Sequence, residues 1–385
     1  MTDRRIAIIG GGPGGLLLAR VLATRGIAAT VFEREGGVSD RSQGGTLDMH
    51  AATGQHALRL AGLEAEFRAV ARPEDQGVRL YDPAGTLLHH EETGFDPDSD
   101  RPEVDRGVLR QLLLDALAPG VVRWGHKLRA IDLHADGTSE LTFDAGAVER
   151  FDLVVGADGA WSRVRPLVAD VAPTYSGITF VELTITDVDS RHPELARMVG
   201  RGKMFALGAG RGLVAQRNGN ARIFVYAALP VAADWAVSGA LDPARPAETK
   251  AMLAEWFAGW APELLALIHQ AGPRVVPWRL HALPVGFRWA HRPGVTLIGD
   301  AAHVMSPFSG QGANLALRDA ADLATALADA PPAHWQAGIA DFEAAMFDRA
   351  AGAAAEAAGA LEGVFASDGL QHMVDHFRGH HATSR

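Results

Sequence analysis

The sequence has no cysteine, few lysines and no long apolar run. Without cysteine, the chain cannot form disulfides, use a thiolate in catalysis or build a Cys-type zinc site. Of its 36 basic residues, three are lysines, namely Lys127, Lys203 and Lys250. No segment approaches the roughly 20 apolar residues that a membrane helix needs. The formal net charge of −10 argues against a nucleic-acid partner.

The length and composition are those of a globular protein with room for two domains. The chain has 385 residues, of which 48% are hydrophobic and 21% charged. Residues 1–10 already have the pattern of a strand that enters a glycine-rich loop, so we expect no targeting segment before it. We therefore expect a cytoplasmic monomer that acts on a small molecule, with neither a nucleic-acid nor a membrane partner.

A glycine-rich motif near the start predicts a dinucleotide-binding unit. A β-branched run at residues 5–9 predicts a buried strand, and residues 16–25 predict the helix that follows. The glycines between them allow a tight turn, a close approach of the backbone to a pyrophosphate and close helix packing. An acidic residue about 20 positions later typically holds ribose hydroxyls, and Glu33 has that place. The loop glycines that we assign to the cofactor are Gly10, Gly12, Gly14 and Gly15.

A second motif follows another predicted buried strand at residues 151–157. Asp158-Gly159 ends this strand, and a short carboxylate beside a glycine can fix both the loop and a dinucleotide. Ser162 and Arg165 are three residues apart, which predicts that they share one face of a helix.

The third motif combines a strand, an acidic turn and a glycine-rich helix start. Residues 295–298 predict the strand, and Asp300 is placed to accept from a ribityl hydroxyl. Gly310, Gln311 and Gly312 open a helix whose positive end would face a flavin ring. His303 invites an acid–base role, but we expect it to be structural, because flavin hydroxylation does not need a histidine base.

Together the three motifs resemble those of class A flavoprotein monooxygenases, the para-hydroxybenzoate hydroxylase type, and the resemblance spans nearly the whole chain. Residues 41–50, 102–106 and 299–314 are more specifically similar to the tetracycline-inactivating monooxygenases of the TetX type. The resemblance implies an α/β fold: a Rossmann-like FAD-binding domain, a β-sheet substrate domain and a long C-terminal bridging helix.

The same resemblance assigns roles by motif. Glu33 and Arg34 would hold the adenosine half of FAD, and Arg41 would lie where NADPH approaches. Two further residues, Asp48 and Arg106, would contact FAD from opposite sides. We also assign to the cofactor Asp158, Asp300, Pro307, Gly310, Gln311, Gly312 and Asn314. Arg41 and Arg110 remain open to being surface charges, and Asp48 to being a helix N-cap.

The substrate region departs from the TetX pattern. A glutamine, an arginine and a histidine of that family appear here as Glu182, Lys203 and Phe224. Lysine does not replace arginine at a bidentate site, and phenylalanine cannot hydrogen-bond. We expect a pocket for a polycyclic ligand with polar points at Glu182, Lys203 and Gln216 and walls made by Met204, Phe205, Val214, Phe224 and Phe308.

The expected domains interleave along the chain. The FAD-binding domain would comprise residues 1–72, 98–170 and 285–330, and the substrate domain 73–97 and 171–284. Strands are expected at 178–186, 203–206, 212–216 and 222–229, with one helix over 247–271. A long bridging helix would occupy 331–366, and the histidine-containing tail, 367–385, would be solvated and partly disordered.

The resemblance implies an FAD-dependent monooxygenase that consumes NADPH and O2. It would hydroxylate a tetracycline or another aromatic polyketide through a C4a-hydroperoxyflavin, so we name no catalytic side chain and no metal. A halogenase would need a Trp-x-Trp-x-Ile-Pro stretch, which is absent. An FAD epoxidase or reductase, an NAD dehydrogenase, and a flavin-loaded protein that sequesters a drug without turnover remain alternatives.

Overall fold

The computed structural model of the chain divides into two compact units. It describes residues 4–38, 40, 44–92, 94–96, 98–144, 146–236, 238, 241–242, 244–331 and 333–383. Unit 1 comprises Met1–Ala71, Arg106–Thr174 and His281–Ala357, and unit 2 comprises Arg72–Asp105, Tyr175–Leu280 and Ala358–Arg385. These borders differ by several residues from those expected, most of all where unit 1 extends to Ala357 inside the long helix.

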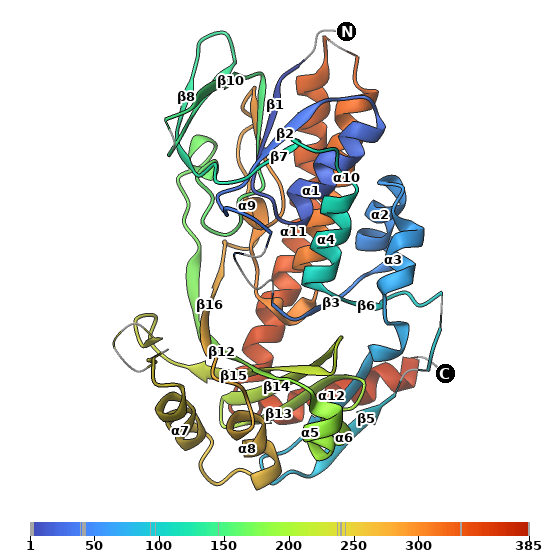
Figure 1. Cartoon of the computed structure of the whole chain (residues 1–385), viewed down its shortest axis with the longest axis vertical. Coiled ribbons are helices and arrows are strands. Elements are labelled where there is room, and N and C mark those ends of the chain that lie inside the picture. The colour runs from blue at the N-terminus through green and yellow to red at the C-terminus, as the bar shows by residue number, and fades with distance from the viewer. Residues whose placement is uncertain are drawn as a thin grey trace. The chain divides into compact units, whose positions relative to one another are not determined.

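Unit 1 is built on a five-stranded sheet in the order β17-β11-β1-β2-β7. Figure 1 labels three of these strands, β1, β2 and β7. Neighbouring strands of the sheet pair in parallel. The strands are β1 (Ile6–Ile9), β2 (Ala29–Phe32), β7 (Val122–Arg123), β11 (Leu153–Gly156) and β17 (Val295–Leu297). Every residue of β1, β11 and β17 is buried, as expected for the central strands of a parallel sheet. A small antiparallel sheet joins β8 (Leu128–Leu133), β9 (Ser139–Phe143) and β10 (Val148–Phe151).

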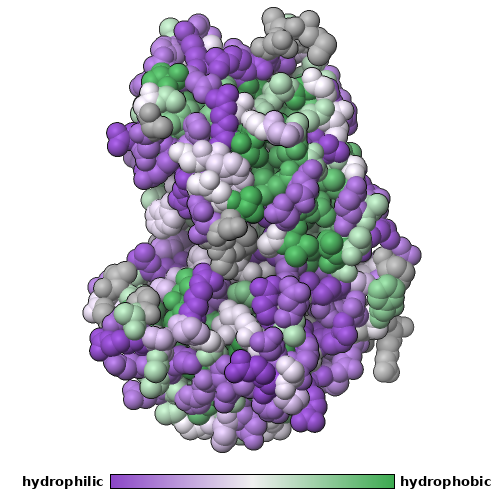
Figure 2. Space-filling model, viewed as in Figure 1, coloured by the Kyte–Doolittle hydropathy of each residue, from purple (hydrophilic) through white to green (hydrophobic). Residues whose placement is uncertain are grey.

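The helices of unit 1 follow the expected strand-loop-helix pattern. Helix α1 (Pro13–Thr24) packs against α10 (Gly312–Asp329) and α4 (Arg106–Asp115). Shorter elements are β3 (Thr46–Asp48), η1 (Ala51–Gln55), α2 (His56–Leu60), α3 (Glu64–Val70), η3 (Arg165–Leu167), α9 (Asp300–His303) and η5 (Pro307–Ser309). On unit 1, Figure 2 shows hydrophobic side chains gathered over α4 and its neighbouring helices.

Unit 2 is a seven-stranded sheet in the order β16-β12-β15-β14-β13-β4-β5. Its strands are β4 (Gly77–Tyr81), β5 (Leu87–Glu91), β12 (Thr174–Ile185), β13 (Gly202–Gly208), β14 (Arg211–Asn218), β15 (Arg222–Pro230) and β16 (Val276–Ala282). Unit 2 also contains η2 (Pro73–Asp75), β6 (Glu103–Asp105), α5 (Val188–Arg191), α6 (Pro193–Val199), α7 (Pro246–Trp256) and α8 (Pro262–His269). One face of the sheet packs with α5, α6, α7 and α8 into a hydrophobic core.

Two helical expectations are corrected. The single helix expected over 247–271 is broken into α7 and α8, because Gly259 has a φ of 83° and Pro262 begins the second helix. The tail expected to be partly disordered forms α12 (Gly369–Thr383), which packs against β13 and β5. The long helix is present as α11 (Trp335–Phe365). Among the described residues, no helix has the length and apolar character to cross a bilayer.

Candidate active site

The glycine loop after β1 combines tight packing with open space. A Cβ at Gly10, whose φ is 112°, would lie 2.3 Å from the Ala157 carbonyl oxygen, and one at Gly15 would lie 2.1 Å from the Gly10 carbonyl oxygen. A Cβ at Gly12 would meet no atom within 4 Å. Gly10 and Gly15 are therefore required by the fold, whereas Gly12 faces space that a ligand can enter.

The amino end of α1 carries features of an anion site. Gly12 is its N-cap in an extended conformation, no side chain caps the helix, and its first turn contains no acidic residue. The N–H groups of that turn lack intrahelical partners, and they lie at the positive end of the helix dipole. Gly14, where a Cβ would lie 3.1 Å from the Ala316 carbonyl oxygen, allows α1 and α10 to pack closely.

Two side chains hold the Gly11 peptide from opposite sides. Its N–H donates to Glu33 Oε2 at 2.6 Å, and its carbonyl oxygen accepts from Arg110 Nε at 3.1 Å. Arg110 also donates to Glu35 Oε2 at 2.8 Å. Arg110 is only 2% exposed, so the interpretation of this residue as a surface charge is wrong. Its third guanidinium nitrogen, Nη1, is buried and has no hydrogen-bond partner among the described residues.

The residues predicted for the adenosine half lie at the end of β2. Glu33 is buried, and its second oxygen accepts the Glu35 N–H at 2.9 Å, whereas Arg34 is exposed. Arg41, expected near NADPH, lies outside the described residues. The orphaned Arg110 nitrogen beside this loop fits the ribose and phosphate oxygens of a dinucleotide, since a buried donor needs an acceptor.

The second motif forms a loop rather than the expected helix. Asp158 Oδ2 accepts the Arg163 N–H at 2.7 Å, and Oδ1 is buried without a hydrogen-bond partner among the described residues. Burial raises the pKa of the Asp158 carboxyl. Ser162 Oγ accepts the N–H groups of Val164 and Arg165 at the start of the 3-10 helix η3. The expectation that Ser162 and Arg165 share one helix face is therefore wrong.

Arg165 fastens this loop to α9. Its guanidinium donates to three backbone carbonyl oxygens, those of Ala160 at 2.6 Å, Val171 at 3.0 Å and Ala301 at 3.0 Å. Burial lowers the pKa of Arg165. These three bonds to the backbone make Arg165 a structural residue.

The buried pair His303–Asp319, with the half-buried Arg349, supports the turn that presents Asp300. Asp300 is exposed at the start of α9, directly after Gly299, whose φ is 59°. Asp319 Oδ2 accepts from the Gly299 N–H at 3.1 Å and lies 2.6 Å from His303 Nε2, and Oδ1 accepts from Arg349 at 3.0 Å. Burial alone would lower the pKa of His303, but the Asp319 carboxylate outweighs it and raises that pKa. Burial raises the pKa of Asp319, but His303 and Arg349 together bring it below its usual value.

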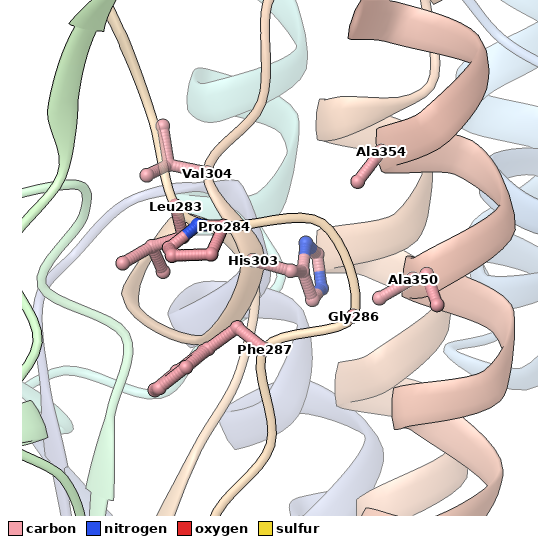
Figure 3. Close-up of a pocket in the computed structure, with 9 residues that line it drawn as sticks. Leu283, Pro284, Gly286, Phe287, His303, Val304, Ala350 and Ala354 are labelled. Carbon is pink, nitrogen blue, oxygen red and sulfur yellow. The ribbon is translucent and has the colours of Figure 1, made fainter.

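His303 also lines a small cavity (Figure 3). Nδ1 is buried and has no hydrogen-bond partner among the described residues. The cavity has a volume of about 10 Å³, close to the minimum for one water molecule. Residues from the 283–287 loop and Ala350 and Ala354 of α11 line it, and no acid–base partner points into it from the described lining. The structural role expected for His303 agrees with this geometry.

The predicted cofactor residues around α10 bind one another. Asn314 is buried, and its amide donates to the Asp48 carbonyl oxygen at 2.7 Å and accepts the His50 N–H at 2.9 Å. A Cβ at Gly310 would lie 3.0 Å from Asp48 Oδ2, so glycine is needed there. Asp48 ends β3 and is not a helix N-cap.

The other predicted residues near this helix are exposed or half-buried. Gln311 donates to Glu356 Oε2 at 2.7 Å just before α10, which begins at Gly312 without a side-chain cap. Arg106 is exposed at the first position of α4. On η5, Pro307 is exposed and Phe308 is half-buried.

The residues of unit 1 fit FAD. An uncapped helix start behind an open glycine suits a pyrophosphate, and the buried Arg110 and the half-buried Asp158 each offer a buried polar atom that has no hydrogen-bond partner among the described residues. These residues, with the exposed Asp300, would hold the dinucleotide.

With the exception of Met204, the predicted substrate residues of unit 2 lie in two adjacent rows on one face of its sheet, opposite the core. We call this the two-row face. The strand register defines the rows. The first row is Val78, Lys203, Gln216, Phe224 and Thr184, and the second is Leu80, Phe205, Val214, Tyr226 and Glu182.

One predicted wall residue is wrong and one polar residue was missed. Met204 is fully buried in the core on the opposite face, because side chains alternate along a strand. Tyr226 lies between Val214 and Glu182 in the second row. Tyr226 could have been predicted from the sequence, because residues two apart on a strand lie on the same face and Phe224 was already assigned to the pocket.

Two charged residues of the two-row face, Lys203 and Glu182, have partners of opposite charge. Lys203 Nζ lies 3.0 Å from Glu103 Oε1 of β6. Glu182 is buried, accepts from Trp278 Nε1 at 3.1 Å and lies 4.0 Å from Arg274. Neither Trp278 nor Arg274 was predicted, since both come from the distant segment around β16.

Comparison with known proteins is consistent with this geometry. The FAD binding domain family matches residues 3–255 and 264–334. The chain is 31% identical to the monooxygenase penA of Penicillium thymicola over 372 residues, which cover 85% of each chain. It is 33% identical to 3-amino-4-hydroxybenzoate 2-monooxygenase PtmB3 of Streptomyces platensis over 328 residues, covering 84% of this chain and 79% of that protein.

Solved structures share the fold. HpxO of Klebsiella pneumoniae, complexed with FAD and uric acid, has a TM-score of 0.80 at 22% identity, covering 98% of this chain and 92% of that one. The tetracycline destructase Tet(55) has a TM-score of 0.74 at 23% identity, covering 95% and 91%. Likeness at this identity concerns the fold, so it does not extend the expected TetX-type resemblance to the substrate. The chain belongs to the FAD binding domain family and is an FAD-dependent class A flavoprotein monooxygenase.

Proposed function

We propose that the protein hydroxylates a polycyclic aromatic or enolic substrate, such as a tetracycline or a related aromatic polyketide. The observation that carries the proposal is the two-row face of unit 2. Its apolar side chains include Phe205, Val214 and Phe224, and polar groups lie among them at Gln216, Tyr226 and Glu182. Apolar side chains arranged in rows, with a few polar groups among them, suit a flat, multi-ring ligand.

The residues of unit 1 would bind and orient the cofactor. When bound, FAD supplies the redox and oxygen-transfer chemistry, with NADPH and O2 as co-substrates. The α1 amino end would bind the pyrophosphate, and Asp300 would accept from the ribityl chain. The uncapped amino end of α10 would stabilise negative charge that develops nearby.

The residues of unit 2 would position the substrate and exclude water. Phe224 and Phe205 offer ring faces for stacking. Tyr226 and Gln216 can hydrogen-bond to carbonyl or hydroxyl groups of the ligand. Positioning of this kind lowers the barrier without a catalytic side chain, so we assign no nucleophile and no acid–base pair.

Substrate-dependent NADPH oxidation tests the proposal. The FAD-loaded protein is mixed with NADPH and either tetracycline, an anthracycline, a monocyclic phenol or no aromatic compound. Faster oxidation with a polycyclic compound, together with a hydroxylated product, is the expected result. Faster oxidation with the monocyclic phenol alone would contradict the polycyclic assignment. Tight binding of tetracycline without NADPH consumption or product would instead indicate sequestration.

A further inference from the structure

Two basic side chains, one in the two-row face and one at its edge, form ion pairs with carboxylates of the strand β6. Lys203 of the first row lies 3.0 Å from Glu103. Arg222, two residues before Phe224 on the same strand face, lies 2.9 Å from Asp105 Oδ2. Glu103 and Asp105 are alternate residues of β6 and are 2% and 4% exposed.

Asp105 is held firmly in this position. Besides Arg222, its carboxylate accepts from Arg72 at 2.8 Å, from Asn218 Nδ2 at 3.1 Å and from the Gly219 N–H at 3.2 Å. A carboxylate with this many donors is held in one position, so its contact with Arg222 is built into the fold.

The second row adds negative charge. Glu182 is 3% exposed and lies 4.0 Å from the half-exposed Arg274. Within the described part of the face, Lys203 and Arg222 are thus matched by Glu103 and Asp105, and Glu182 is a third carboxylate.

This charge pattern bears on the ligand. A substrate carboxylate that enters a water-poor site needs an available cation, best a bidentate arginine, to offset its desolvation. Here Lys203 already has a carboxylate partner, and Glu182 would repel another anion. A phenol, enol, ketone or carboxamide carries no such cost.

We propose that the enzyme selects aromatic substrates without a carboxylate, and that Glu103 sets this specificity by neutralising Lys203. The inference rests on the proposed function, because it takes the two-row face as the substrate-binding surface. Glu103 is a specificity-determining residue in this account and takes no part in the oxygen transfer.

A matched ligand pair tests the inference. The two ligands are 1-hydroxynaphthalenes that carry either a carboxamide or a carboxylate at the same ring position. They have nearly the same shape and differ in charge at neutral pH. Dissociation constants for both are measured by fluorescence quenching on the FAD-loaded wild type, Glu103→Gln, Glu103→Gln/Lys203→Met and Glu92→Gln. Glu92 is an exposed carboxylate of unit 2 that pairs with Arg79, so Glu92→Gln controls for the loss of one charge.

The wild type should bind the carboxamide at least about tenfold more tightly than the carboxylate, and Glu103→Gln should reduce that ratio about tenfold by releasing Lys203. The double variant should restore the preference, and Glu92→Gln should leave it unchanged. A wild type that prefers the carboxylate would overturn the inference, whether or not Glu103→Gln folds. An unchanged ratio in a folded Glu103→Gln protein would also overturn it.

Turnover of the same ligands separates this inference from the proposed function. If the carboxamide preference is found but no polycyclic compound is hydroxylated, the specificity stands and the proposed function fails. If hydroxylation occurs without the preference, the inference alone fails. If neither naphthalene compound binds, the two-row face is not the substrate surface and the inference is wrong. The NADPH oxidation assay with tetracycline and the other aromatic compounds then still tests the proposed function.

Discussion

His303 and Asp319 form a buried pair in unit 1, with 2.6 Å between the imidazole Nε2 and a carboxylate oxygen. The same carboxylate accepts the Gly299 N–H and a hydrogen bond from Arg349. The backbone turn that presents Asp300 is therefore anchored to an ionic cluster inside the unit. We expect the strength of that anchor to determine how well the turn is held for the cofactor.

Replacement of Asp319 with Asn should destabilise unit 1 strongly. The change leaves His303 and Arg349 with a neutral amide, and removing one partner of a buried pair costs about 3–5 kcal/mol. Thermal unfolding of the apoprotein would show a lower midpoint. Asp322→Asn is the control, since Asp322 also pairs with Arg349, at 3.2 Å, but is partly exposed. Equal midpoints for the two variants would contradict the account.

The contribution of His303 should depend on pH in a defined direction. Its raised pKa means that the pair stabilises the fold fully below the ordinary histidine pKa of about 6.5 and loses this contribution as pH rises through the raised value. The lowered pKa of Asp319 acts at the acid end, where the contribution is lost as pH falls through that value. The difference in unfolding midpoint between wild type and His303→Gln should therefore be largest near pH 6 and shrink at alkaline pH. A difference that grows with pH would contradict the assignment.

Gly12→Ala should separate cofactor binding from folding. The added methyl meets no protein atom within 4 Å, but it would occupy space that we assign to the pyrophosphate. The unfolding midpoint of the apoprotein should stay near that of the wild type, while FAD affinity falls at least about tenfold, corresponding to about 1.4 kcal/mol. Gly352→Ala on α11, where a methyl also meets nothing, should leave FAD affinity unchanged. Wild-type affinity in Gly12→Ala would show that the loop does not approach the cofactor.

Arg110→Gln should reduce FAD affinity more than a surface charge change does. Glutamine cannot bond to the Gly11 carbonyl and Glu35 together and still offer a third donor, which the guanidinium does. Titration of the apoprotein with FAD should show weaker binding in this variant, and the exposed control Arg129→Gln should bind normally. If Arg110→Gln binds FAD as the wild type does, the orphaned nitrogen has no cofactor role.

Phe224→Ala and Val225→Ala should have opposite consequences, because these neighbours lie on opposite faces of β15. Phe224 belongs to the two-row face and Val225 to the core. The first variant should raise the substrate KM and leave flavin content alone. The second should cost stability, with about 1–3 kcal/mol lost from the core, and leave KM nearly unchanged. Loss of flavin in Phe224→Ala would show that this residue supports the fold and does not act in substrate binding.

Local patterns sufficed to predict the nucleotide unit. The strand at 6–9, the glycine turn and the helix from residue 13 depend on neighbouring residues, and the expected elements appear there as β1 and α1. The long bridging helix expected over 331–366 appears as α11 (Trp335–Phe365). The substrate strands β12 to β15 likewise appear at nearly the expected places.

Contacts between distant residues were not predictable. The burial of Arg110 depends on Glu35, 75 residues away, and the neutralisation of Lys203 depends on Glu103, 100 residues away. Met204 was misplaced because a run of apolar residues on β13 does not reveal which ones face the core. The break between α7 and α8 was signalled by Gly259 and Pro262, but the apolar spacing around them favoured one helix.

The measurement that tests the central claim most directly is the fate of isotope-labelled dioxygen. The FAD-loaded enzyme is incubated with NADPH, labelled O2 and tetracycline or an anthracycline, and the products are analysed by mass spectrometry. The account predicts a product that has gained one labelled oxygen atom, in an amount matching the NADPH that the substrate causes to be consumed. NADPH consumption with only peroxide formed and no labelled product from any polycyclic compound would contradict it.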